Sequence, residues 1–159
     1  MSHTTLLLVD DNKADSDYII TLLKEVAPDK FKVITASNMV EALEVIQRHE
    51  VEIITLDLFL PDSQGLGTLL AIRVKAPDTP VVIVSGMDDQ HVTRQAMYYG
   101  AQAYLVKGEF DGPKLFEAMV QAIARQSHES LDKAVKLMKK NLEETKHLTT
   151  PEQTPAEAG

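Results

Sequence analysis

The chain has 159 residues, of which 44% are hydrophobic and 25% charged, and this composition is typical of one globular domain with a short addition. It contains no cysteine, which excludes disulfide frameworks, thiol catalysis and cysteine-bound zinc. The net charge of −8 opposes direct binding to nucleic acid, and no apolar run reaches the roughly 18 residues of a membrane span. The apolar run at residues 6–9 is too short for a signal peptide, so we expect a cytoplasmic protein.

Short β-branched runs alternate along the chain with segments of helical apolar spacing. In chain order the sequence predicts strands and helices in turn, at residues 6–9, 18–26, 31–35, 40–47, 51–56, 66–72, 81–84, 92–99, 103–106 and 113–123. This alternation predicts an α/β fold, because parallel strands need helical crossovers. We expect a flavodoxin-like, doubly wound, five-stranded parallel sheet with strand order 2-1-3-4-5.

Local signals mark the ends of several of these helices. Asn38 followed by Glu41 resembles a capping box, and Asp11 or Asn12 is suited to cap the first helix. Gly100 is expected to end the fourth helix, and Pro113 is suited to the first turn of the fifth.

A further helix is predicted after the α/β domain. We expect the domain at residues 1–127, an added C-terminal helix at 128–147 and a disordered tail at 148–159. Four apolar residues recur at spacings of four, three and four within the added helix: Leu131, Val135, Met138 and Leu142. Three interpretations stay open: this helix folds back on the domain, pairs with a second copy in a homodimer, or docks on another protein.

Polar residues follow four of the five predicted strands. Asp10 and Asp11 come after the first strand, Asp57 after the third, Ser85 after the fourth and Lys107 after the fifth. Because the ligand crevice of such a sheet lies at the carboxyl ends of its strands, we expect these side chains to converge there.

Three carboxylates gathered in one crevice need positive charge. Two like charges about 4 Å apart repel by about 4 kcal/mol at an effective dielectric constant of 20. A divalent cation with oxygen ligands fits, and Mg²⁺ is the usual choice beside phosphates. The set suits phosphoryl transfer to a carboxylate, with Asp57 as nucleophile, Lys107 neutralising charge and Ser85 donating a hydrogen bond.

These residues resemble a known family, the receiver domain of bacterial two-component response regulators in its CheY-like, stand-alone form. The acidic pair Asp10-Asp11 and the lysine Lys107 match that family, as does Ser85 followed by glycine. Asp57 is followed by Pro61 and Gly65 at the family's spacing. Tyr104, three residues before Lys107, is similar to the family's switch aromatic. The resemblance covers roughly residues 5–126.

The resemblance implies specific roles for these residues. Asp57 would accept a phosphoryl group from a sensor histidine kinase, a phosphotransfer protein or a small phosphodonor, and would become an aspartyl phosphate. Asp10 or Asp11, Asp57 and the backbone carbonyl of Phe59 would bind Mg²⁺. Ser85 would then move towards the phosphoryl group and Tyr104 would turn inward, which makes the protein a switch rather than an enzyme.

One residue departs from the family pattern. Gly108 follows Lys107, where the family usually has proline. Glycine adopts many backbone conformations, so the resemblance implies a looser loop at residues 107–112 than is usual.

Our leading hypothesis is a single-domain response regulator that signals by phosphorylation-dependent contact with an unknown output protein, without nucleic-acid or membrane binding. Only 32 residues follow residue 127, too few for an output domain. One alternative is a degenerate receiver that acts as a phosphorylation-independent binding or dimerisation module. A phosphohydrolase is the other, although Phe59 occupies the position where such enzymes carry a second acid.

Overall fold

The computed structural model describes the backbone of residues 3–158 and the side chains of residues 3–145. Contacts between residues group the chain into two units, Met1–Gln126 and Ser127–Gly159. The first unit contains the sheet and the residues singled out above. None of the helices in residues 3–158 combines the length and the hydropathy needed to cross a membrane.

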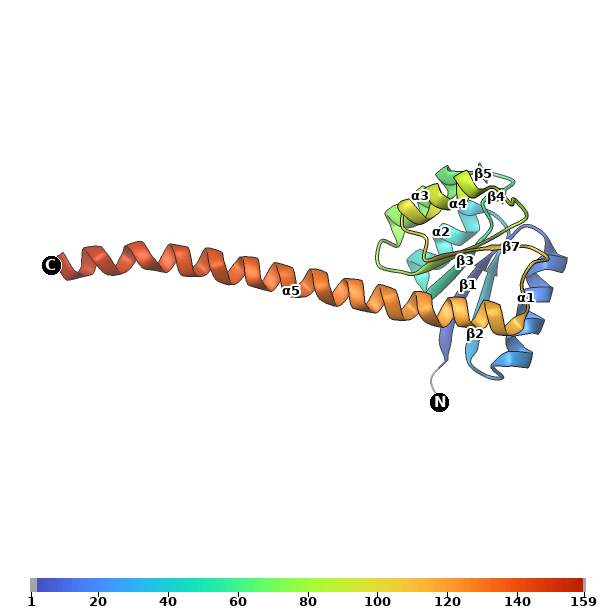
Figure 1. Ribbon diagram of the computed structural model, residues 1–159, viewed down its shortest axis with the longest axis horizontal. Coiled ribbons are helices and arrows are strands. Elements are labelled where there is room, and N and C mark those ends of the chain that lie inside the picture. The colour runs from blue at the N-terminus through green and yellow to red at the C-terminus, as the bar shows by residue number, and fades with distance from the viewer. Residues whose placement is uncertain (1–2, 159) are drawn as a thin grey trace. The chain divides into compact units, whose positions relative to one another are not determined.

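Five parallel strands form the main sheet of the described chain, in the order β2-β1-β3-β6-β7 (Figure 1). Their bounds are β1 Thr4–Val9, β2 Phe31–Ala36, β3 Ile53–Leu56, β6 Val81–Ser85 and β7 Ala103–Val106. Counting only these five strands, this is the order 2-1-3-4-5, so the predicted topology is confirmed. All four residues of β3 and all five of β6 are buried, as expected for central strands covered on both faces.

Helices cover both faces of this sheet. They are α1 Lys13–Val26, α2 Met39–Arg48, α3 Leu66–Lys75, α4 Gln90–Tyr98 and α5 Gly112–Ala158. Alternate side chains of a strand point to opposite faces, so Leu7 of β1 packs in the cluster that contains residues of α2, α3 and α4. Its neighbour Leu8 packs in the cluster with Leu23 of α1 and Leu115 of α5. The doubly wound arrangement expected from the sequence is therefore present.

The first turns of the helices follow the predicted signals, with shifts of one residue. Asn12 caps α1 by accepting the backbone N–H of Asp15 at 3.0 Å. Asn38 caps α2 by accepting the N–H of Glu41 at 2.8 Å. The Glu41 carboxylate reaches back to the N–H and the hydroxyl of Ser37, so the reciprocal bond of the capping box is made one residue earlier than usual.

A small hairpin follows β3 and was not predicted. Its strands, β4 Phe59–Leu60 and β5 Ser63–Gln64, are antiparallel. Asp62 at its tip accepts hydrogen bonds from the first two N–H groups of α2, at 2.8 Å and 3.1 Å. Two-residue strands are too short to show an alternating pattern, which explains why the sequence does not reveal them.

The second unit consists of the continuation of α5. One uninterrupted helix runs from Gly112 to Ala158, where the sequence predicted two helices with a boundary at residue 127. Leu131, Met138 and Leu142 are 61%, 62% and 67% exposed. The side chains from residue 146 onward lie outside the described residues, and so does Gly159. The predicted domain bounds and the predicted disordered tail at 148–159 therefore stay predictions.

Candidate functional site

The carboxyl ends of four neighbouring strands carry the residues selected from the sequence. Asp10 follows β1, Asp57 follows β3, Ser85 ends β6 and Lys107 follows β7. The backbone N–H of Asp57 bonds to Val9 at 2.9 Å, which holds the ends of β1 and β3 level. Strand order alone therefore delivers these side chains to one edge of the sheet.

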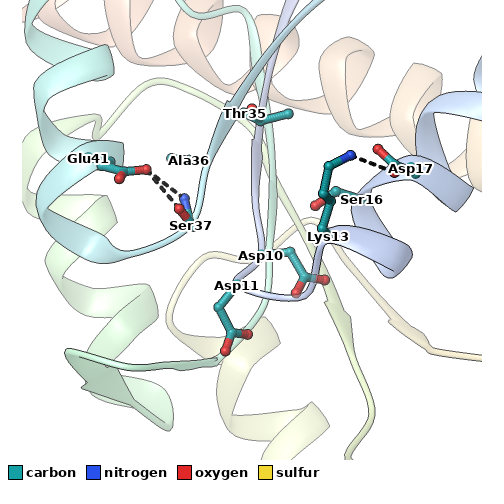
Figure 2. A pocket seen from close by; sticks show the side chains of 9 residues that line it. All are labelled: Asp10, Asp11, Lys13, Ser16, Asp17, Thr35, Ala36, Ser37 and Glu41. Carbon is teal, nitrogen blue, oxygen red and sulfur yellow. Dashed lines mark hydrogen bonds and ion pairs between the residues drawn. The ribbon is translucent and has the colours of Figure 1, made fainter.

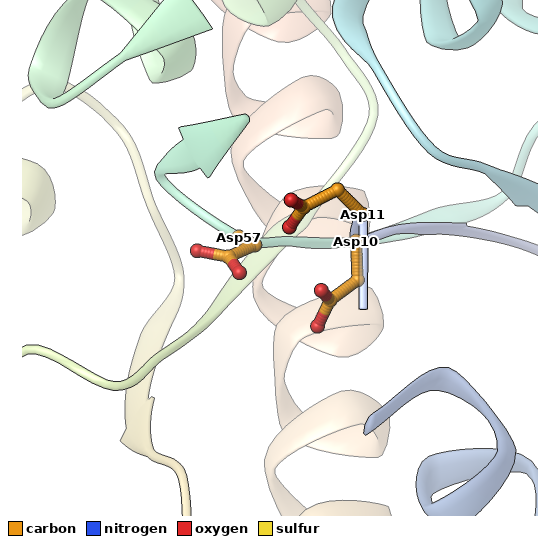
Figure 3. A group of neighbouring side chains, drawn as sticks. All are labelled: Asp10, Asp11 and Asp57. Carbon is orange, nitrogen blue, oxygen red and sulfur yellow. The ribbon is translucent and has the colours of Figure 1, made fainter. Parts of the chain in front are cut away.

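Three carboxylates form a cluster at this edge (Figure 3). One oxygen from each of Asp10, Asp11 and Asp57 lies within 4.8 Å of the other two. Asp10 and Asp57 are buried, at 5% and 6% exposure, whereas Asp11 is exposed. An all-oxygen donor set with this much negative charge suits a hard divalent cation such as Mg²⁺ or Ca²⁺.

Asp10 is held in place by two hydrogen bonds. Its Oδ1 accepts the N–H of Asn12 at 2.9 Å, and its Oδ2 lies 2.8 Å from the Lys107 ammonium. Burial raises the pKa of the Asp10 carboxyl, and the bonds from Lys107 and Asn12 offset only part of that rise. Asp10 therefore binds a proton more readily than an exposed aspartate does.

Lys107 is the positive centre of the site. Its Nζ lies 2.8 Å from Asp10, 2.8 Å from Asp15 and 2.9 Å from Asp57. Burial acts to lower the pKa of this ammonium, but the hydrogen bonds to the three carboxylates outweigh burial and raise it above the ordinary value. Lys107 is therefore charged throughout the physiological pH range.

Asp15 is the member of this group that sequence reasoning missed. It lies in the first turn of α1, whereas the other carboxylates follow strands. In the sequence, Asp15 stands out only as an acidic residue in the first turn of a helix, which usually indicates interaction with the helix dipole. That position does not predict a contact with a lysine 92 positions away.

Asp57 is fixed at both carboxylate oxygens. Oδ1 accepts the N–H of Phe59 at 3.0 Å and Oδ2 accepts a hydrogen bond from Lys107 at 2.9 Å. An open pocket beside it is lined by Asp57, Phe59, Gly86 and Met87. A second hollow is lined by Asp10, Asp11 and residues at the starts of α1 and α2 (Figure 2). Asp57 is thus accessible from a pocket although its side chain is largely buried.

Ser85 and Tyr104 lie on the neighbouring strands and meet through Met87. Ser85 is fully buried and its Oγ accepts the N–H of Met87 at 3.2 Å. The Tyr104 hydroxyl donates to the carbonyl of Met87 at 2.8 Å. Burial raises the pKa of the Tyr104 hydroxyl, and a hydrogen bond with Ser85 offsets part of the rise. The hydroxyls of Ser85 and Tyr104 therefore share one small network.

Gly108 has a backbone φ of +85°. Proline is locked near φ −65° and cannot adopt this conformation. The glycine after Lys107 is therefore matched to the local backbone path, and the loop differs in conformation from one that carries the proline expected of the family.

Comparison with known proteins identifies the family. The family model described as "Response regulator receiver domain" matches residues 6–121. The chain belongs to the response regulator receiver family. Receivers carry a phosphoacceptor aspartate in two-component signalling, they interact with histidine kinases or phosphotransfer proteins, and they are switches that are not generally classed as enzymes. An acidic cluster like that of Asp10, Asp11 and Asp57 is typical of the receiver metal site.

Individual relatives agree with this assignment. A probable C4-dicarboxylate response regulator of Priestia megaterium is 32% identical over 120 residues, which are 75% of this chain and 50% of that protein. Chemotaxis protein CheY of Listeria monocytogenes is 32% identical over 119 residues, 74% of this chain and 96% of CheY. The receiver thus spans about half the length of the first relative and nearly all of the second.

One solved structure adds a chemical detail about a similar protein. A Burkholderia pseudomallei response regulator was crystallised with a phosphorylated aspartic acid, a calcium ion and citrate. It is 27% identical, with a TM-score of 0.63, over 81% of this chain and 74% of that chain.

Proposed function

We propose that this receiver is a single-domain, cytoplasmic response regulator whose phosphoacceptor is Asp57. It takes a phosphoryl group from a sensor histidine kinase or a phosphotransfer protein with the help of Mg²⁺. It then signals through phosphorylation-dependent contact with an output protein that binds its changed surface. The observation that carries this proposal is the buried Asp57 carboxylate, 2.9 Å from the Lys107 ammonium within a cluster of three acids.

The reaction is a displacement at phosphorus. A carboxylate oxygen of Asp57 forms a bond to phosphorus while the phosphorus–nitrogen bond of a phosphohistidine breaks, and the imidazole nitrogen keeps the electron pair. With an acyl phosphate the phosphorus–oxygen bond breaks and the carboxylate leaves. No outside oxidant or reductant is needed, because the chemistry is transfer of one phosphoryl group.

Several groups of this chain prepare that step. Asp10, Asp11, Asp57 and the Phe59 carbonyl would hold Mg²⁺, which would supply positive charge for the phosphoryl oxygens. Lys107 orients Asp57 through the bond to Oδ2 and offers a fixed positive charge beside the phosphorus. The Phe59 N–H fixes the second oxygen of Asp57, so the carboxylate does not have to reorganise before attack.

Ser85 and Tyr104 are the side chains that would change position on phosphorylation. A phosphoryl group adds strong acceptor oxygens, and the Ser85 hydroxyl is the neutral donor on the neighbouring strand. When Ser85 turns towards the phosphoryl group, it leaves the N–H of Met87. Tyr104 is then free to leave the Met87 carbonyl and turn inward. A structural analogy supports the chemistry, since a similar regulator carries a phosphorylated aspartate together with Ca²⁺.

Intact mass spectrometry tests the proposal. Incubation with Mg²⁺ and acetyl phosphate should add one phosphoryl group, and this adduct should be lost at alkaline pH, as an acyl phosphate is. Asp57→Asn and removal of Mg²⁺ with EDTA should both abolish the adduct. Asp78→Asn is the matched control because Asp78 is an exposed aspartate outside the site, and it should be phosphorylated like the unmodified protein. An adduct that persists in Asp57→Asn would contradict the assignment.

The second candidate is a phosphorylation-independent binding or dimerisation module. The exposed apolar side chains on α5 favour it, in particular Leu131, Met138 and Leu142. It would be preferred if binding to an output protein, or self-association, were the same for the unmodified protein, for Asp57→Asn and in EDTA.

A further inference from the structure

Lys107 has no hydrogen-bond donor to spare. An ammonium group carries three N–H donors, and its three carboxylate partners, Asp10, Asp15 and Asp57, all lie within 2.9 Å. A phosphoryl group on Asp57 therefore gains a bond from Lys107 only if an existing bond is released.

The three partners differ in what they lose on release. The side chains of Asp10 and Asp57 are 2% and 8% exposed, whereas that of Asp15 is 40% exposed. Water can replace Lys107 at Asp15, but it has little access to the other two carboxylates. Asp15 is thus the partner that gives up Lys107 most readily.

We propose that Asp15 is a positioning residue that competes with the phosphoryl group of Asp57 for Lys107 and so restrains phosphorylation. This inference rests on the proposed function of Asp57. Asp15 contacts Lys107 from the first turn of α1. Its own backbone N–H donates to the side-chain oxygen of the Asn12 cap at 3.0 Å. The ion pair is therefore built into the start of the helix, and Asp15 acts through Lys107 without taking part in the bond changes at phosphorus.

Charge gives the direction of the effect. Asp10, Asp15 and Asp57 contact a single ammonium, and Asp11 lies beside Asp10 and Asp57, so the site has an excess of negative charge before an anionic phosphodonor arrives. Phosphorylation adds about one further negative charge at Asp57. Replacement of Asp15 by asparagine keeps the shape of the side chain and removes one of the opposing charges, so it should favour the transfer.

The experiment measures phosphorylation by acetyl phosphate in Mg²⁺. During this transfer the phosphorus–oxygen bond to acetate breaks as the bond to Asp57 forms, and acetate leaves with the electron pair. We expect Asp15→Asn to raise the initial rate roughly three- to fivefold, as for loss of a partly exposed ion pair. Asp15→Glu, which keeps the charge, should return the rate towards that of the unmodified protein.

Asp17→Asn is the matched control. Asp17 lies on the same helix and forms an exposed ion pair with Lys13 at 2.9 Å (Figure 2), so its replacement changes the net charge by the same amount without touching Lys107. Equal acceleration by Asp15→Asn and Asp17→Asn would overturn the inference, because it would indicate a general charge effect. An unchanged or slower rate in Asp15→Asn would overturn it too.

A second readout does not depend on phosphorylation. The ¹⁵N-detected ammonium resonance of Lys107, recorded without phosphodonor, should shift or broaden in Asp15→Asn and stay in place in Asp17→Asn. An unmoved resonance in Asp15→Asn would contradict the contact itself. If the unmodified protein forms no phosphoryl adduct, the proposed function fails together with this inference. If the unmodified protein and Asp15→Asn form the adduct at the same rate, this inference fails and the proposed function stands.

Discussion

Asp10 is an acidic side chain in surroundings that disfavour its charge. Its side chain is 2% exposed, and burial raises the pKa of the carboxyl despite hydrogen bonds from Lys107 and Asn12. A raised folded-state pKa means that the folded protein binds a proton more readily than the unfolded chain. The free energy of unfolding therefore falls as the pH rises from the ordinary pKa of 3.8 through the raised folded-state pKa. An ionised Asp10 thus destabilises the metal-free fold at neutral pH.

Asp10→Asn should stabilise the metal-free protein at neutral pH. The amide removes the buried charge, and we expect the melting temperature to rise by roughly 2–5 °C. The difference from the unmodified protein should grow as the pH rises above 3.8, the ordinary pKa of an aspartate, because Asp10 ionises with a raised pKa and asparagine does not titrate. Thermal unfolding followed by circular dichroism at several pH values, in EDTA, measures it.

The same variant should lose affinity for Mg²⁺, since it removes a carboxylate from the proposed metal site. Asp78→Asn changes the net charge equally at an exposed position and should alter neither property. A lower melting temperature for Asp10→Asn in EDTA would show that the bond to Lys107 outweighs the cost of burial.

Sequence reasoning at this scale found Asp10, Asp11, Asp57, Ser85 and Lys107 because each directly follows or ends a strand. Parallel strands bring their carboxyl ends to one edge, so position along the chain was enough to group these side chains. Asp15 was missed because its contact depends on how closely the first turn of α1 approaches the end of β7. That approach is set by packing of the helix on the sheet, which residue spacing does not encode.

At the scale of elements, the β4–β5 hairpin links the strand that precedes Asp57 to a neighbouring helix. Asp57 precedes the hairpin, and Asp62 at its tip accepts the N–H groups of Met39 and Val40. The hydrogen bond from the Met39 N–H lowers the pKa of the Asp62 carboxyl, with a further contribution from Val40. The hairpin thus satisfies two helix N–H groups that otherwise lack partners.

Asp62→Asn should destabilise the protein at neutral pH. The amide oxygen is a weaker acceptor than the carboxylate and carries no charge to favour the helix N-terminus, so we expect the melting temperature to fall by a few degrees. A lowered pKa gives stability that is present above pH 3.8, the ordinary value, and is lost as pH falls through the folded-state pKa.

The difference between Asp62→Asn and the unmodified protein should therefore disappear in acid. Thermal melts from pH 7 down to about pH 2 follow it, with Asp78→Asn as the exposed control. A difference that is constant with pH would mean that the carboxylate charge of Asp62 plays no part.

Elements of regular length were predictable, because buried strands read as apolar runs and helices show a 3.6-residue period. The five strands of the main sheet and the first four helices are where the sequence places them, within about five residues, and so is the start of the fifth helix. The uninterrupted course of α5 was not foreseen. The polar residues near 127 look like a boundary in sequence, although nothing in them stops a helix, since neither glycine nor proline lies there.

At the scale of the molecule, the second unit supplies the part of the chain that a minimal receiver does not need. The family model ends at residue 121, and α5 continues to Ala158. The apolar residues from Leu131 to Leu142 recur at four-three-four spacing, which is the spacing of a coiled-coil seam. Pairing of this segment with a second copy in a homodimer is one of the three interpretations that the sequence leaves open.

Met138→Ser should weaken self-association if that seam is the contact. Sedimentation velocity over a range of protein concentrations should then show less dimer for Met138→Ser than for the unmodified protein. Leu137→Ser is the matched control, because Leu137 is exposed to a similar extent, 59% against 62%, and lies off the seam. Equal effects of the two substitutions would contradict the seam, and a monomer at all concentrations would contradict the homodimer.

The positive φ of Gly108 has a consequence for protein engineering. An engineer who edits this chain towards the family pattern would place proline directly after Lys107. Such an edit would force the backbone φ of residue 108 from +85° to about −65°, next to the lysine that contacts Asp57. The segment from β7 to the start of α5 should therefore be transplanted as one piece, with its glycine kept.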